Sequence, residues 1–402
     1  MSNAFLHSFS APTKSESDFV KIVKAEGALL WDDAGKEYID GLANLWLCQV
    51  GHGQQEIADA VYEQMNQMAA YNTFDPFTNG PAAEVAEMIA ARSPHPDGRV
   101  FLACSGSEAV DTAIKMSRLV GQLKDAGGDK QIIIRRTGGY HGTNLGGTSV
   151  QGIEVNRVGW GDLVPHFLEV SNDDIEDAAK VFAEHGNKIA AVMCEPVQGA
   201  GGVNVPPPGY LEGLRRLCDD NDALLIFDEV ISGFGRTGSW FGAQTFGVTP
   251  DLMTFAKGVT SGYQPLSGVI MSRQVANIFE SDVAKFMHGY TYSGHPAACA
   301  AGIANIKIIE REGLIDRANE IGEIIRTGLE AMQSDGQVKA VHGIGAIWAA
   351  DIGRDAFPVR DAMLDAGVVV RPIGERIAFC PPLVITDAQI TTMLDALAAQ
   401  LD

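Results

Sequence analysis

Cysteine is scarce in this sequence of 402 residues, with six in all and no CxxC pair among them. They are dispersed along the chain, at Cys48, Cys104, Cys194, Cys218, Cys299 and Cys380. Dispersed single cysteines are typical of reduced core thiols in a cytoplasmic protein. They argue against a disulfide framework and against a metal site.

Positive charge and long apolar runs are also in short supply. The chain has 30 Lys and Arg against 51 Asp and Glu, which gives a formal net charge of −21. Nucleic acid and anionic membrane surfaces would repel such a chain, so neither is expected as a partner. No apolar run approaches membrane-spanning length, and the N-terminal residues lack the basic region and apolar core of a signal peptide.

What the sequence does contain is typical of a globular protein with two domains. Apolar residues make up 46% and charged residues 20% of a chain long enough to bury a large core. Strands are expected at 99–104, 131–135, 189–194, 223–228 and 267–271, and helical patterns alternate with them. This alternation predicts a doubly wound α/β domain. A hairpin at 20–40 and two long helices from residue 297 onward would form a smaller domain from the two chain ends.

Residues 223–230 carry the central hypothesis. Apolar residues lead into Asp228, which would lie at the carboxyl end of a buried strand, where open α/β sheets bind ligands. Lys257 ends a second apolar stretch downstream. An acid and an amine at neighbouring strand ends suit pyridoxal 5'-phosphate (PLP), because lysine condenses with its aldehyde while the acid keeps the pyridine nitrogen protonated. Taken alone, the two residues would more simply be a solvated acid and a surface lysine.

Three further segments could complete such a site. Residues 105–109 follow a strand and open a helix, whose N-terminus could hold a phosphate or could simply be capped. Tyr140, in a glycine-rich loop, could cover one face of the pyridine ring, whereas His141 is expected to support the site rather than act as a base. Glu195 directly follows another apolar strand, where it could bond Tyr140, His141 or Asp228 or stay solvated.

These segments occur in an order that resembles the class III PLP-dependent aminotransferases of fold type I. The matching motifs are SGSEA at 105–109, YHG at 140–142, EPVQGAGG at 195–202, DEVISGFGR at 228–236, FAKG at 255–258 and HGYTYSGHP at 288–296. The resemblance covers nearly the whole chain. It implies an α/β fold in which residues 51–299 form a large domain around a mostly parallel sheet. Residues 1–50 and 300–402 would form a smaller α+β domain.

The resemblance also implies roles for individual residues. Lys257 would hold the cofactor as a Schiff base and then shuttle the proton, while Asp228 would pair with the pyridinium nitrogen. The other residues implied to bind the cofactor are Gly106, Ser107, Tyr140, His141, Glu195, Val230 and Thr291. Thr291 matches a residue that reaches the phosphate of the neighbouring subunit. A homodimer with active sites at the interface is therefore implied, with a tetramer as the alternative.

Within the family, the chain is similar to the ω-aminotransferases, which pair β-alanine, other ω-amino acids or simple amines with pyruvate. Trp46 matches the tryptophan that lines the substrate pocket, and Phe9 matches the phenylalanine that closes it from the partner chain. Arg371 matches a mobile arginine that binds a substrate carboxylate and withdraws for an apolar amine. Ala200 stands where relatives that use 2-oxoglutarate carry a glutamate that neutralises an arginine, which favours pyruvate.

Several alternatives stay open. A 4-aminobutyrate-type aminotransferase that uses 2-oxoglutarate, or a PLP-dependent lyase, would share Lys257 and Asp228. Arg371 could instead be a surface charge at a strand end. A nicotinamide-dependent dehydrogenase would need GxGxxG between an early strand and a helix, where the sequence has none. A non-enzymatic PLP-binding regulator would need a basic surface to meet DNA, and the charge balance opposes one.

Overall fold

The computed structural model describes residues 4–124 and 129–401 of the chain. Its largest sheet has seven strands in the order β4-β10-β9-β8-β7-β5-β6. Their bounds are β4 Arg99–Ala103, β5 Ile132–Arg136, β6 Phe167–Val170, β7 Ile189–Cys194, β8 Leu224–Asp228, β9 Leu252–Phe255 and β10 Ser267–Met271. Only β10 runs against its two neighbours, β4 and β9, and the other pairs are parallel. The carboxyl ends of the remaining strands therefore lie along one edge.

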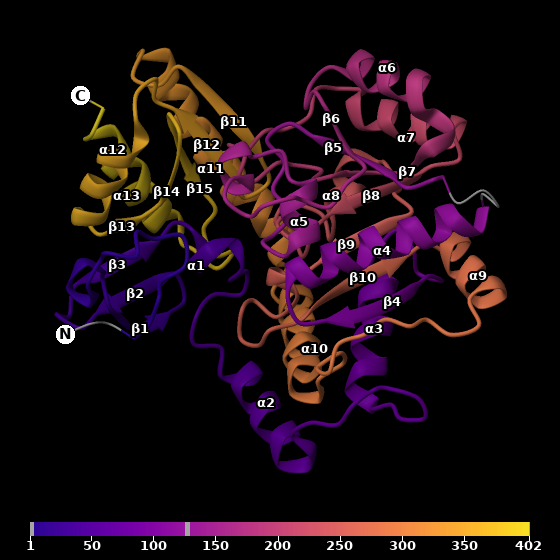
Figure 1. Cartoon of the computed structure of the whole chain (residues 1–402). Helices are drawn as coiled ribbons and strands as arrows, with labels where there is room; N and C mark the ends of the chain where they lie inside the picture. The colour runs from indigo at the N-terminus through magenta and orange to yellow at the C-terminus, as the bar shows by residue number, and fades with distance from the viewer. Residues whose placement is uncertain (1–3, 125–128, 402) are drawn as a thin grey trace.

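Helices cover both faces of this sheet, as Figure 1 shows. Strands β7 and β8 are buried along their whole length. Leu224 and Ile226 of β8 pack in one core cluster with α4 (Gly106–Lys124), whereas Leu225 and Phe227 pack in the other with α7 (Tyr210–Asp220). Side chains alternate between faces along a strand, so an unbroken apolar run is what a strand covered on both sides requires.

The two ends of the chain meet in a separate part of the molecule, where indigo and yellow segments lie together in Figure 1. One four-stranded sheet has the order β1-β2-β3-β13 and the other β11-β12-β15-β14. The pairing of β13 with β3 joins the two chain ends directly. The strand bounds are β1 Ile22–Glu26, β2 Leu29–Asp32, β3 Glu37–Asp40, β11 Ala340–Ile344, β12 Ile347–Asp351, β13 Val368–Val369, β14 Arg371–Ile373 and β15 Arg376–Phe379. The domain boundaries at residues 50 and 300 stay a prediction.

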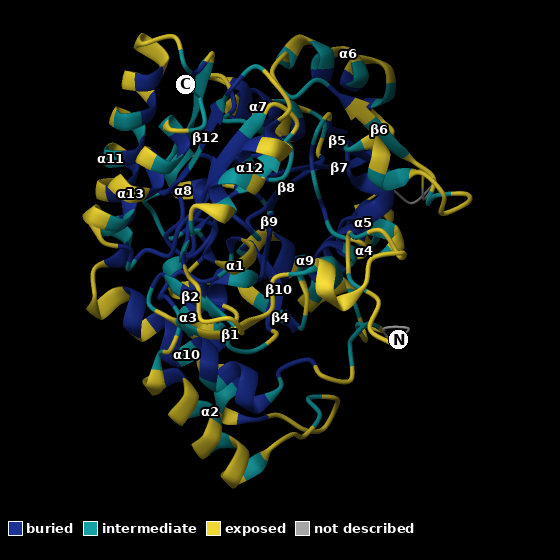
Figure 2. Ribbon diagram, turned by 90° about the vertical axis from the view of Figure 1, so that its left-hand side faces the viewer, coloured by how far each residue is buried: buried dark blue, intermediate teal, exposed yellow. Residues whose placement is uncertain are grey.

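The remaining helices surround these sheets. They are α1 Ala43–Trp46, α2 Gln55–Met68, α3 Gly80–Arg92, α5 Leu145–Val150, α6 Ile175–His185, α8 Gly242–Phe246, α9 Arg273–Asp282, α10 Pro296–Arg311, α11 Leu314–Ser334, α12 Ala356–Asp365 and α13 Asp387–Ala398. Buried residues lie along the sheets and between them and the helices, while α2 exposes one face (Figure 2). Within the described ranges, no helix is both long and apolar enough to cross a membrane.

The sequence predicted most of the large sheet. The strands expected at 99–104, 131–135, 189–194, 223–228 and 267–271 are confirmed to within one residue at each end. The predicted hairpin at 20–40 is also confirmed, as strands β1 to β3. Strand β6 was not predicted, because it is a short edge strand with only one buried residue and so lacks a long apolar run.

Candidate active site

The predicted site residues lie at the carboxyl edge of the large sheet. Asp228 is the last residue of β8, Glu195 directly follows β7, and Lys257 follows β9 at the start of a short 3-10 turn. Tyr140 and His141 lie in the loop after β5. Because these strands are parallel neighbours, their ends bring the four segments together.

Asp228 is buried and both of its carboxylate oxygens are held. His141 Nδ1 lies 2.8 Å from Oδ2, and Oδ1 accepts from Thr254 Oγ1 at 3.0 Å and from the amide of Val230 at 3.2 Å. A carboxylate oxygen accepts hydrogen bonds, so His141 donates through Nδ1. This bond lets His141 orient Asp228, and the supporting role expected for His141 stays a prediction.

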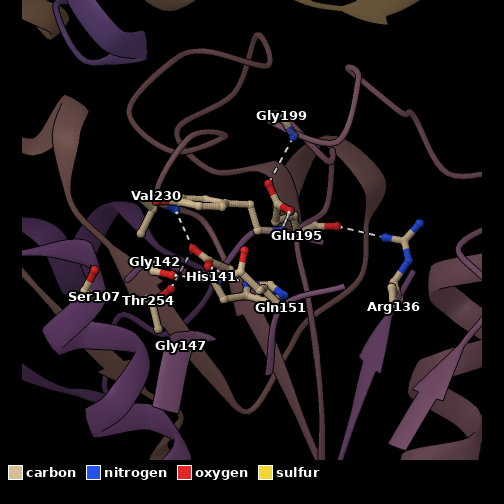
Figure 3. A network of polar contacts seen from close by, with 12 residues as sticks. Ser107, Arg136, His141, Gly142, Gly147, Gln151, Glu195, Gly199, Val230 and Thr254 are labelled. Atoms are coloured by element: carbon tan, nitrogen blue, oxygen red, sulfur yellow. Dashed lines mark hydrogen bonds and ion pairs between the residues drawn. The ribbon is translucent and has the colours of Figure 1, made fainter. Parts of the chain in front are cut away.

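Glu195 joins two loops of the site. Its Oε1 accepts from the amide of Tyr140 at 2.8 Å, and its Oε2 accepts from the amide of Gly199 at 3.0 Å. The close view in Figure 3 shows this network, including the bond of 2.9 Å from Arg136 to the Glu195 carbonyl. Burial raises the pKa of Glu195 to about 6, although hydrogen bonds and His141 act in the opposite direction. Glu195 thus fixes the backbone beside the Tyr140 ring.

Lys257 has a strained backbone and a perturbed amine. Its φ is +48°, a left-handed conformation that residues other than glycine rarely adopt. Burial lowers the pKa of its amine, and the charges of Asp228 and Glu195 only partly offset that effect. No described residue forms a hydrogen bond or ion pair with Nζ. A partly buried amine with a lowered pKa is well suited to act as a nucleophile and as a base.

The first turn of α4 lies against the same space. A Cβ on Gly106 would stand 3.2 Å from Val230 Cγ1 and 3.6 Å from Ala256 Cβ, the residue before Lys257. Ser107 Oγ accepts from the amide of Thr143 at 3.0 Å. This places a helix N-terminus, with its unpaired amides and positive dipole end, beside the segments that carry Asp228 and Lys257.

Capping also occurs at this helix start, as the simpler interpretation requires. The amide of Glu108 bonds Ser105 Oγ at 3.2 Å, and Glu108 Oε2 accepts from the amides of Cys104 and Ser105 at 2.8 and 3.1 Å. These bonds leave the amides of Gly106 and Ser107 available to an anion. Together with the partly buried amine of Lys257 and the fixed carboxylate of Asp228, this arrangement fits PLP.

Trp46 and Arg371 flank this space from the sheets of the chain ends. Trp46 is only 2% exposed, and a Cβ on Gly199 would stand 2.3 Å from its Cζ3 atom, so the ring lies directly on that glycine. Arg371 begins β14 and is partly buried, which lowers its pKa, while Tyr140 acts in the opposite direction. No described carboxylate forms an ion pair with it. Ala200, next to Gly199, offers no acid to it either.

Two predicted residues lie on the outside of the single chain. Phe9 is 77% exposed, and Thr291 is also exposed, in the segment before α10. Their predicted roles depend on a neighbouring subunit.

Sequence patterns missed two supporting residues. Thr254 bonds Asp228 from β9, but it lies inside an apolar run and its partner is set by the strand register that pairs the two residues. Arg136 ends β5 with 1% exposure and bonds the carbonyls of Glu195 and Asn172. A charge at the end of an apolar strand is the signal that could have identified Arg136.

Comparison with known proteins places these features in a family context. The family described as aminotransferase class-III matches residues 10–401. A beta-alanine–pyruvate aminotransferase of Pseudomonas aeruginosa is 38% identical over 98% of this chain and 94% of its own length. An omega-amino acid–pyruvate aminotransferase of Pseudomonas putida is 37% identical over 95% of this chain and 91% of its own length.

Solved structures agree with the sequence comparison. An (S)-enantioselective omega-transaminase from Thermomicrobium roseum superposes with a TM-score of 0.94 at 34% identity, covering 98% of this chain and 95% of that one. An omega transaminase from Pseudomonas jessenii, solved in complex with PMP, has a TM-score of 0.93 at 32% identity, with the same coverage of each chain.

Proposed function

The chain belongs to the class III aminotransferases, and from that premise we propose that it moves the amino group of an ω-amino acid or simple amine to pyruvate. Membership of the family confirms the predicted fold type I and the predicted dependence on PLP. The reaction consumes an amine donor and an oxo acid. With β-alanine and pyruvate as substrates, the products would be an aldehyde acid and alanine.

Arg371 offers a contact for one acceptor carboxylate, and Ala200 favours pyruvate over 2-oxoglutarate. Arg371 is partly buried and has no described counter-ion, so a carboxylate that reached it would gain a charge-assisted bond. The alanine at position 200 supplies no internal acid to compete with that carboxylate. Relatives named for β-alanine, ω-amino acids and putrescine all pair them with pyruvate, which supports the same acceptor here.

The chain's own residues would supply binding and proton transfer. Lys257 would hold the cofactor, Gly106 and Ser107 would bind its phosphate, and Tyr140 would cover its ring. When bound, PLP supplies an electron-accepting ring and the aldehyde that carries the amino group between substrates. Lysine at its usual pKa of about 10.4 is a poor base at neutral pH, so the lowered pKa allows Lys257 Nζ to take the proton from the donor carbon.

Asp228 would provide the main electrostatic contribution. Its carboxylate would keep the ring nitrogen protonated, and its three hydrogen bonds hold it in place before the reaction begins. A preorganised charge needs no rearrangement when negative charge develops in the transition state. His141 supports this role from behind the carboxylate, and Glu195 holds the Tyr140 backbone.

We also propose that the active form is a homodimer. The loops around residues 71–77 and 287–292 lie together, because Thr73 Oγ1 bonds the Ser293 carbonyl at 3.0 Å. They expose a set of large apolar side chains: Tyr71, Phe74, Phe77, Met287 and Tyr292. A second copy would cover this surface and give Thr291 and Phe9 of each chain a site to complete.

The six free cysteines, five of them buried, support a reducing compartment such as the cytoplasm.

An acceptor comparison tests the proposed reaction. Purified enzyme loaded with PLP is given β-alanine with either pyruvate or 2-oxoglutarate, and the amino acids formed are measured by chromatography. We expect alanine to form at least about tenfold faster than glutamate, because either acceptor can offer one carboxylate to Arg371 and only 2-oxoglutarate carries a second one that needs a further partner. Faster glutamate formation would assign the chain to the 2-oxoglutarate users. Donor consumption without either amino acid would indicate a lyase.

A further inference from the structure

Between β3 and α2 the backbone adopts conformations that ordinary residues avoid. Ala43, Asn44 and Trp46 have φ values of +50°, +61° and +64°, and none of them is glycine. Non-helical dihedrals at Asn44 and Leu45 break the short helix α1. Such strain persists only where the surroundings impose it, and it concentrates at functional sites.

A single carboxylate holds this segment. Asp40, the last residue of β3, is fully buried and accepts from the amide of Leu42 at 3.1 Å and from the amide of Asn44 at 2.7 Å. His52 Nε2 bonds the same carboxylate at 2.9 Å. Asp40 and His52 therefore hold the strained turn in place, and the backbone of His52 is itself fixed to Gly27 by two bonds of 2.9 Å.

The strained turn places one large side chain against the site. The Trp46 ring lies against Gly199 and shares an apolar cluster with Ile231, three residues after Asp228. The amide of Gly199 bonds Glu195, whose other oxygen bonds the amide of Tyr140. A shift of the turn would move Trp46 relative to the wall that carries Tyr140.

We propose that Asp40 and His52 are positioning residues that fix Trp46 and thereby limit the size of the amine donor. This inference rests on the proposed function, because it takes Trp46 to line the donor pocket. Neither residue belongs to the cofactor site. Losing either one should change substrate preference more than it changes cofactor binding.

Asp32 offers a matched control in the same sheet. It also accepts two backbone amides, from Ala34 at 3.0 Å and Lys36 at 2.8 Å, and one side-chain donor, Tyr38 Oη at 2.8 Å. Its turn lies between β2 and β3 and does not carry Trp46. Asp32 is partly exposed whereas Asp40 is fully buried, so the comparison of Asp40→Asn with Asp32→Asn uses the donor ratio and Trp46 labelling, not stability.

The kinetic test compares a bulky arylalkylamine with β-alanine as donor, using PLP-loaded enzyme and pyruvate. In Asp40→Asn the amide NH₂ faces one of the two backbone donors, so that donor loses its acceptor. We expect the ratio of kcat/KM for the bulky donor to kcat/KM for β-alanine to rise about fivefold or more, mainly through KM. His52→Ala should give a smaller rise, His52→Gln should restore the ratio, and Asp32→Asn should leave it unchanged.

An activity-independent measurement separates this inference from the proposed function. Hydroxyl-radical labelling of the free protein, read by mass spectrometry, reports the accessibility of Trp46, which is 2% exposed in the wild type. We expect Trp46 labelling to rise several-fold in Asp40→Asn and His52→Ala and to stay low in Asp32→Asn. If Asp40→Asn does not fold, His52→Ala decides. Unchanged labelling overturns the positioning role even in an active enzyme, whereas increased labelling in an enzyme that makes no alanine overturns only the proposed function.

Discussion

Asp228 and Arg371 lie at the ends of strands in two different sheets, and the protein holds them in contrasting ways. Asp228 has three hydrogen bonds of 2.8 to 3.2 Å from His141, Thr254 and the Val230 amide. Arg371 has no described ion-pair partner and is only partly buried. The proposed cofactor side of the site is thus organised before any ligand arrives, whereas the proposed substrate side presents a charge without an ion-pair partner among the described residues.

This difference indicates that the residues for the shared reaction are held more firmly than the residues for substrate choice. A reaction common to a whole family needs an acid and an amine in one fixed relation, and the large sheet supplies it through parallel strand ends. A donor and an acceptor that alternate in one pocket need a wall that can adapt, and a residue with few bonds can move. Mutations on the two sides should therefore change different kinetic constants. Those on the cofactor side should lower kcat, and those on the substrate side should raise KM.

The largest effect is expected at Lys257. Lys257→Ala removes the amine that would hold the cofactor and move the proton, so alanine formation should fall by roughly 10⁴-fold or more. PLP should still bind through the phosphate and ring contacts, but without the absorption band of the lysine-bound cofactor. Lys285→Ala, a change at an exposed lysine, is the control. Turnover near the wild-type rate in Lys257→Ala would remove this residue from the mechanism.

Asp228→Asn should show that the cofactor side acts through fixed charge. The amide keeps the shape but cannot hold the ring nitrogen protonated, so kcat should fall about 10² to 10³-fold while circular dichroism stays unchanged. Thr254→Val removes only one of the three bonds to the carboxylate and should cost much less. Equal rates for Asp228→Asn and the wild type would mean that the charge of Asp228 does not contribute to the rate.

Arg371→Ala tests the substrate side directly. Loss of a charge-assisted carboxylate contact should raise the KM for pyruvate by about 10 to 100-fold and leave kcat/KM for a carboxylate-free amine nearly unchanged. Arg360→Ala is the matched control, because Arg360 lies nearby on α12 but already pairs with Asp361 at 2.7 Å. Similar effects on pyruvate and on the apolar amine would place the carboxylate clamp elsewhere.

The smallest effect concerns the stability of the cofactor side. Burial raises the pKa of Glu195 from 4.5 to about 6, because the folded protein favours the protonated carboxyl. The protonated Glu195 side chain therefore contributes its full stabilisation of the fold below pH 4.5, and this stabilisation is lost as the pH rises through about 6. The wild type should therefore lose about 2 kcal/mol of unfolding free energy relative to Glu195→Gln between pH 4 and pH 8. Denaturant unfolding of both proteins across this range measures the difference. A constant difference would mean that the carboxyl does not titrate there.

The sequence could identify Asp228, Glu195 and Lys257 because each interrupts or ends an apolar run that only a buried strand explains. Tyr140 and Ser107 followed from loops between such strands and helices. In each case the chemical signal and the structural signal coincide, so the pattern indicates both the element and the residue.

The rest depends on geometry that a sequence does not display. Thr254 meets Asp228 only through the register of two paired strands. The segment with positive φ values at Ala43, Asn44 and Trp46 contains no glycine, so the sequence gives no sign of the turn. The hydrogen bonds by which Asp40 holds this turn form only when the chain folds. Phe9 and Thr291 are exposed on the single chain, so their predicted roles require a second copy.

Trapping the cofactor on the protein would identify the lysine that holds it. Enzyme loaded with PLP is reduced with borohydride, which makes the lysine–cofactor bond permanent, and is then digested and mapped by mass spectrometry. We expect the added mass to lie on the peptide containing Lys257, in roughly one copy per chain, as a single tethering lysine requires. Labelling of a different lysine, or of none, would contradict it.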